Sequence, residues 1–316
     1  MAKFASWALL VPTIERIVER GGEPLMIGAA RFASLSSIAA MSVAIALDKY
    51  GKAYYRGDDL GWTQGPHGIA STAVMACSLV LLWAVSSKGK RLTAILSALL
   101  AVGVVMSFVR TTLLTMAIIV GAYLLVSARD RRARNVVLVL LIVLGAIVMS
   151  TEIRSMFSAR VSDLRNLQAG GSAVLWAGGG RVGIWLGVLQ RVSKNWHTLL
   201  LGEGSGSSFD AVRLAMGTSV WAHNDFLEML STGGLLMLTA YVALLAWIGK
   251  PLFRFRTLRD SETEGLRVIG AATLVAFTMM AFFNGMMWYQ ASVLAAIAFG
   301  WTRARVGRSL STGRSP

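Results

Sequence analysis

Blocks of apolar residues recur along almost the whole chain, and each is close to the roughly 20 residues that an α-helix needs to cross a bilayer. They lie near residues 26–47, 68–86, 92–109, 111–127, 136–150, 226–249, 268–284 and 287–301. Apolar residues make up 55% of the sequence and charged residues only 15%, which is not the balance of an ordinary soluble domain. The sequence therefore predicts an all-α polytopic membrane protein with about eight transmembrane helices.

Short basic clusters indicate the orientation of these spans. They occupy residues 87–91, 129–134, 250–259 and 303–308, and alternation of the spans puts every one of them on the same side of the membrane. Because positively charged loops stay in the cytoplasm, we expect a multi-pass protein of a bacterial inner membrane. The clusters also account for the net charge of +15 without a nucleic-acid partner.

The opposite, periplasmic side carries one long connection. The chain accordingly divides into an N-terminal transmembrane bundle (1–150), a large periplasmic loop (151–225) and C-terminal transmembrane helices with a basic cytoplasmic tail (226–316). Connections longer than about 12–15 residues are usually functional or disordered. Basic residues outnumber acidic ones in this loop, which favours an anionic partner. The single cysteine, Cys77, lies in an apolar block, so no disulfide framework or thiol metal site is expected.

Two arginines are candidates for binding that anion. Arg181, in GGGRVGIWLGVLQRV (178–192), precedes apolar residues at helical spacing, which predicts a short amphipathic helix with the arginine near its N-terminus. A helix start and a guanidinium together suit a phosphate, and anchoring of the helix at the lipid headgroups explains the residue equally well. Arg110, in SFVRTTLLTM, lies between two apolar runs, where a polar cavity is favoured over snorkelling to the headgroups.

The end of the long loop gathers polar residues at the mouth of a span. The stretch WAHNDFLEML (221–230) contains His223, Asn224, Asp225 and Glu228. Ionisable side chains at the edge of a membrane are costly to remove from water, so they either stay hydrated or serve a function. Their spacing fits no metal site, so we expect His223 to act as a general base or to hydrogen-bond a substrate.

Two further segments are less specific. His67, in GPHGIA, begins another span and either lines the same outer cavity or belongs to a turn. The stretch LLLGEGSGSS (199–208) is rich in glycine and serine but lacks the Lys-Ser/Thr ending of a P-loop. It therefore predicts a close-packed loop rather than a phosphate-binding loop.

Four segments, in chain order, resemble the O-antigen ligase and polymerase superfamily. AHNDFLEMLSTGGLLMLTAYVAL (222–244) resembles the His-Asn-x-x-Leu-x-x-x-x-x-x-Gly signature that ends the periplasmic loop of that family. SFVRTTLLTMAI resembles its Ser-x-x-Arg stretch, and GGRVGIWLGVLQRVSKNWHTLLLGEGSGS resembles its Arg-x-x-x-Trp helix followed by Leu-x-Gly-x-Gly. GPHGIASTAVM is similar to the start of the preceding span, so the resemblance covers residues from about 60 to 250.

The resemblance implies a helical bundle that holds a lipid-linked glycan under the large loop, with an active site that faces the periplasm. It implies an inverting glycosyltransferase, without metal or other cofactor, that moves a glycan from undecaprenyl diphosphate to lipid A-core or to another glycan. Arg110 and Arg181 would hold the diphosphate, and His223 would orient or deprotonate the acceptor hydroxyl. The other expected substrate contacts are Asn224, Trp185, Glu228 and His67.

The resemblance is partial, and other functions stay open. The family usually has about a dozen spans against about eight here, so we expect spans before residue 1 to be missing, with impaired activity. A polysaccharide polymerase of the same superfamily, a protein-glycosylating relative, a transporter and an inactive scaffold are the alternatives. The sequence disfavours a transporter because it contains no internal repeat and no pair of interrupted spans.

The alternating basic clusters generate a topology prediction. Reporter fusions after residue 90, 132 or 258 should report a cytoplasmic position, and a fusion after residue 200 a periplasmic one, because clusters of lysine and arginine resist translocation. Enzymatic reporters active on only one side of the membrane measure this. A cytoplasmic signal at residue 200 would contradict the assignment of the long loop.

Overall fold

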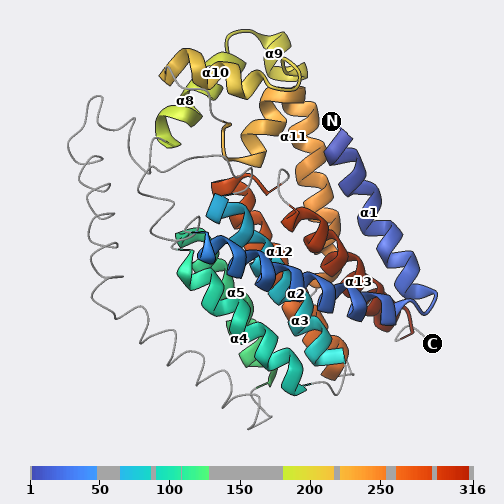
Figure 1. Cartoon of the computed structure of the whole chain (residues 1–316). Helices are drawn as coiled ribbons and strands as arrows, with labels where there is room; N and C mark the ends of the chain where they lie inside the picture. The colour runs from blue at the N-terminus through green and yellow to red at the C-terminus, as the bar shows by residue number, and fades with distance from the viewer. Residues whose placement is uncertain are drawn as a thin grey trace. The chain divides into compact units, whose positions relative to one another are not determined.

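The computed structural model describes residues 2–47, 65–86, 90–107, 109–127, 181–216, 221–253, 261–286 and 290–312. Over these residues every regular element is a helix, as the sequence predicts (Figure 1). The longer helices are α1 (Ala2–Glu19), α2 (Glu23–Ala46), α3 (Gly65–Ser86), α4 (Lys90–Met106), α5 (Arg110–Ser127), α11 (Asp225–Leu252), α12 (Ser261–Asn284) and α13 (Ala291–Thr312). The shorter ones are α8 (Arg181–Val192), α9 (Trp196–Leu201) and α10 (Ser207–Met216).

The described residues belong to two compact units. The loop unit contains residues 181–216, 221–244 and 281–285. The bundle unit contains α1 to α5, α13, and the parts of α11 and α12 that lie outside the loop unit. Each unit is described by itself below.

Five of the described helices are long and apolar enough to cross a membrane, by length and composition: α2, α3, α5, α11 and α12. They coincide with predicted spans, so a helical membrane protein is confirmed at this level. The span expected at 92–109 is a shorter apolar helix, and the span expected at 136–150 lies outside the described residues. The block expected at 287–301 begins later, at Ala291, and its helix continues through the expected basic tail to Thr312.

Helix α1 of the bundle unit is not among the predicted spans, because Pro12 and the charges that follow it interrupt its apolar run. It is stabilised by packing against α13, beside which it lies (Figure 1). Trp7 stacks on Phe277 with ring centroids 5.2 Å apart, and its indole N–H donates to the carbonyl of Ser292 at 2.7 Å. Contacts later in α1 fall later in α13, so the two helices run parallel.

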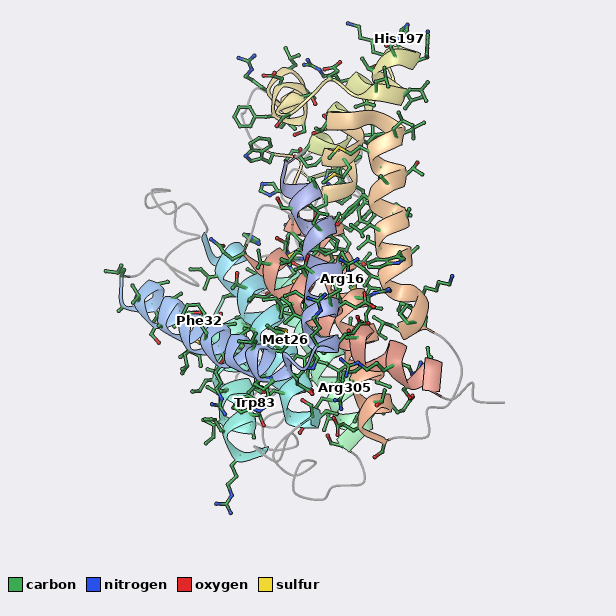
Figure 2. The ribbon with its side chains drawn as sticks, turned by 90° about the vertical axis from the view of Figure 1, so that its right-hand side faces the viewer. Arg16, Met26, Phe32, Trp83, His197 and Arg305 are labelled. Carbon is green, nitrogen blue, oxygen red and sulfur yellow. The ribbon has the colours of Figure 1, made fainter. Side chains whose placement is uncertain are left out.

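The arginines of the expected cytoplasmic tail are paired within the bundle unit. Arg303 forms a 3.1 Å ion pair with Glu15 of α1. Arg305, labelled in Figure 2, pairs with Glu23 at the start of α2 and with Glu262 at the start of α12. These side chains are only partly exposed, so their attraction is screened less than that of a surface pair. Arg303 also donates to the carbonyl of Trp247, so the basic residues of this segment connect α13 to α1, α2, α11 and α12.

Helix α11 is interrupted within the loop unit. Gly233 (φ −135°, ψ 17°) and Gly234 (φ 66°, ψ −162°) are not helical. A continuous helix would separate Asp225 from Tyr241 by about 24 Å at 1.5 Å per residue. Instead, the Tyr241 hydroxyl donates to the Asp225 carboxylate at 3.4 Å, and the ring centroids of Phe226 and Tyr241 are 5.3 Å apart. Residues 225–232 thus fold back along the piece after the glycines, so the span expected at 226–249 is interrupted at Gly233 and Gly234.

The segment after α9 supplies hydrogen-bond donors to the carbonyl groups at the interruption. The backbone N–H of Glu203 donates to the carbonyl of Ser231 at 2.9 Å, and that of Gly204 donates to the carbonyl of Thr232 at 3.0 Å. The backbones approach so closely that a Cβ on Gly202 would lie 2.5 Å from the nitrogen of Gly233. The close-packed loop predicted at 199–208 is therefore confirmed in part: residues 202–204 pack against α11, whereas 199–201 belong to α9 and 207–208 to α10.

Gly234→Ala should destabilise the protein strongly. A Cβ at this position would lie 2.2 Å from the carbonyl carbon of Leu200, and the positive φ is unfavourable for alanine. We expect the free energy of unfolding to fall by at least about 2 kcal/mol. Retention of a monodisperse peak after heating in detergent micelles measures this.

The matched control is Gly121→Ala in α5, where a Cβ would meet no atom within 4 Å. Alanine in a helix interior is better than glycine by up to about 1 kcal/mol, so this variant should be as stable as the parent or more so. Equal effects of the two substitutions would contradict the described geometry of the reversal.

Candidate functional site

Asn284, at the end of α12, is the residue at which two predicted site residues meet. Its side-chain Oδ1 accepts a hydrogen bond from Nη2 of Arg181 at 3.2 Å. Its backbone carbonyl is close enough to the imidazole of His223 to raise the pKa of that ring. Asn284 is buried, and all three residues belong to the loop unit. The structure thus brings together Arg181 and His223 from segments that are 42 positions apart in the sequence.

Arg181 is held in place by α8, of which it is the first residue. The short amphipathic helix predicted here is confirmed over Arg181–Val192. Ile184, Val188 and Val192 lie at helical spacing and are buried in a cluster with residues of α10 and α11. Since this face is packed in the core of the loop unit, the start of α8, where Arg181 lies, is fixed.

His223 is held by the cap of the next helix. The Oδ1 of Asn224 accepts hydrogen bonds from the backbone N–H groups of Phe226 at 2.9 Å and Leu227 at 3.1 Å, so Asn224 is the N-cap of α11. Immediately before it, His223 has a φ of 51°, the one positive φ of a non-glycine residue in the described chain. A left-handed conformation costs such a residue about 1–3 kcal/mol and is most often found at functional sites.

The surroundings of His223 lower its pKa. Burial disfavours the charged imidazolium, and the positive charge of Arg181 acts in the same direction. The Asn284 carbonyl opposes both effects without overcoming them. The imidazole is therefore neutral at pH 7, and one of its ring nitrogens carries a lone pair. A neutral histidine beside a fixed guanidinium can accept a proton from a hydroxyl next to a bound anion.

The expected substrate contacts in the loop unit have partners within the protein. Asn224 caps α11, the indole N–H of Trp185 donates to the carbonyl of Ala222 at 3.0 Å, and the carboxylate of Glu228 accepts from Ser208 and from Ala222. Contact of these side chains with a substrate stays a prediction.

Arg110 and His67 belong to the bundle unit. Arg110 is the exposed first residue of α5, and His67 is partly buried near the start of α3. Their predicted convergence with Arg181 and His223 therefore stays a prediction. His197, at the start of α9, is exposed (Figure 2).

Asn284 itself was missed at the level of the sequence. Its only local signal is a polar residue between the apolar end of a span and a glycine, in FFNGMM. Within the described ranges, no group of three His, Cys, Asp or Glu side chains could hold a metal ion. The chemistry visible in the loop unit is therefore that of a guanidinium, an imidazole and the backbone and side-chain groups of Asn284.

Arg181→Gln should raise the pKa of His223, because it removes the positive charge that repels the imidazolium. The chain has only three histidines, so carbethoxylation of each can be followed separately by mass spectrometry as a function of pH. Lys194→Gln is the control, since it removes an exposed cation of the same unit. An unchanged titration of His223 in Arg181→Gln would show that the two side chains do not interact.

Comparison with known proteins adds no assignment: no family model matches the chain, and no curated protein matches it.

Proposed function

We propose that the protein is a membrane glycosyltransferase that moves a glycan from undecaprenyl diphosphate to an acceptor hydroxyl at the periplasmic face of a bacterial inner membrane, as an O-antigen ligase does. The observation that carries the proposal is the meeting of Arg181 and His223 at Asn284. The family resemblance assigns binding of the diphosphate to Arg181 and activation of the acceptor hydroxyl to His223.

The proposed reaction is a single displacement. The acceptor oxygen attacks the anomeric carbon and transfers its proton to the lone-pair nitrogen of His223. The bond between that carbon and the diphosphate oxygen breaks, and the electron pair leaves with undecaprenyl diphosphate, so the anomeric configuration inverts. Arg181 would stabilise the negative charge that develops on the leaving group. Arg110 is proposed as a second contact to the diphosphate.

A polymerase of the same superfamily would use the same groups with a lipid-linked glycan as the acceptor, so it is the nearest alternative. A transporter is favoured less. Interrupted helices of transporters present unwound backbone carbonyls to their substrates and ions. In α11, the carbonyls of Ser231 and Thr232 at the interruption accept hydrogen bonds from the protein's own backbone instead.

The test is release of undecaprenyl diphosphate by the purified protein in nanodiscs, with a lipid-linked glycan as donor and either lipid A-core or a second lipid-linked glycan as acceptor. His223→Ala should abolish release. Arg181→Lys and Arg110→Lys should fold normally yet slow it by roughly ten- to a hundredfold, because lysine cannot reproduce the paired hydrogen bonds of a guanidinium.

The matched control is Arg213→Lys, an exposed arginine of α10 that pairs with Asp210. It should release the lipid diphosphate at the parental rate. Near-parental rates in Arg181→Lys and His223→Ala would remove the basis of the glycosyltransferase proposal. Turnover with only one of the acceptors separates a ligase from a polymerase.

A further inference from the structure

We propose that Glu228 and Trp185 are positioning residues for His223, which they hold in place by fixing both backbone polar groups of Ala222. Contact with the substrate is the role that the sequence predicts for these two side chains, and their hydrogen bonds to Ala222 support positioning as a further role. The consequence for transfer rests on the proposed function, whereas the positioning itself does not.

Ala222 is fully buried, and its backbone is held from opposite directions. Its N–H donates to Oε1 of Glu228 at 3.0 Å. Its carbonyl accepts from the indole N–H of Trp185, also at 3.0 Å. Since His223 is the next residue, these two bonds fix the point and the direction from which its unusual backbone conformation begins.

Glu228 is itself fixed. The hydroxyl of Ser208 lies 2.8 and 2.7 Å from its two carboxylate oxygens, and the side chain is buried. Ser208 belongs to the first turn of α10, whereas Glu228 lies in the first turn of α11. The carboxylate therefore joins two helices to the strained segment between α10 and α11. A surface-exposed substrate contact would not need such enclosure.

Trp185 couples His223 to Arg181. It follows Arg181 by four positions, so both side chains lie on the same face of α8. Its ring makes an edge contact with Phe282, with centroids 5.3 Å apart, just before Asn284 in α12. One turn of α8 thus contacts the Asn284 segment through Arg181 and the His223 segment through Trp185. The separation of the guanidinium and the imidazole is set by this turn.

The test compares Glu228→Ala with Glu228→Gln. Both substitutions remove the same negative charge, but glutamine keeps an oxygen that can accept from Ala222 and gains an amide that can donate to Ser208. Any change that comes from charge alone should be equal in the two variants. The readout is the carbethoxylation of His223 as a function of pH in substrate-free protein, with the exposed His197 as internal reference. The other charged groups near His223 are Arg181 on α8 and Asp225, two positions later in the sequence. Both are retained in the two variants.

We expect His223 to react about tenfold faster in Glu228→Ala. Loss of one hydrogen bond should increase the fraction of molecules in which the His223 segment leaves its buried position by about this factor. Its pKa should move toward the usual value of an imidazole. Glu228→Gln should stay close to the parent. Trp185→Phe keeps an aromatic ring and loses the indole N–H donor, so the reactivity of His223 should rise as in Glu228→Ala. This variant tests the proposal if Glu228→Ala folds poorly. Trp247→Phe, at a partly exposed tryptophan of α11 in the bundle unit, is the control and should change nothing at His223.

Equal behaviour of Glu228→Ala and Glu228→Gln, together with a parental Trp185→Phe, would overturn the positioning role. The proposed function is tested separately by release of undecaprenyl diphosphate from the same preparations. If His223 responds as expected while the parent shows no transfer, the function fails and the positioning stands. If the parent transfers, Glu228→Ala should lower the rate and Glu228→Gln should restore it.

Discussion

The interruption of α11 at Gly233 and Gly234 is the constraint on which the rest of the loop unit depends. Carbonyl groups that are freed inside an apolar helix must find donors, because lipid offers none. Here the donors are the backbone N–H groups of Glu203 and Gly204. The same pairing that satisfies the interruption therefore fixes the segment after α9 against α11. The reversal also carries the start of α11 back beside Tyr241, where His223 can reach the end of α12.

From that reversal the electrostatics of the site follow. Arg181 and His223 both approach Asn284, and two cations at such a place would repel each other. The conflict is resolved by burial, which disfavours the imidazolium, so the histidine is neutral beside a permanent positive charge. Asn284 completes the arrangement because its amide oxygen and its backbone carbonyl are both acceptors. One residue thus accepts a hydrogen bond from the guanidinium and places a second acceptor near the imidazole.

Features that rest on local patterns could be predicted from the sequence. The helix that begins at Arg181 follows from apolar spacing, and the apolar helices follow from length and composition. The polar cluster around His223 was recognised, but Asn224 and Glu228 were expected only as substrate contacts. Their internal roles depend on partners far away in the sequence, such as Ser208 for Glu228, which periodicity does not reveal. Helix α1 was missed for the same reason, because its stability comes from packing against α13.

The proximity of Arg181 and His223 has a consequence for the order of events in the proposed transfer. With the site empty, the guanidinium lowers the pKa of the imidazole and so weakens it as a base. A bound diphosphate would bring negative charge to Arg181 and offset its effect on His223. The pKa of His223 would then rise, and its affinity for the acceptor's proton would increase only when the leaving group is in place. An acceptor that arrives without the donor would meet the weaker base. In the proposed reaction, proton abstraction would thus be linked to donor binding through this one pair of side chains.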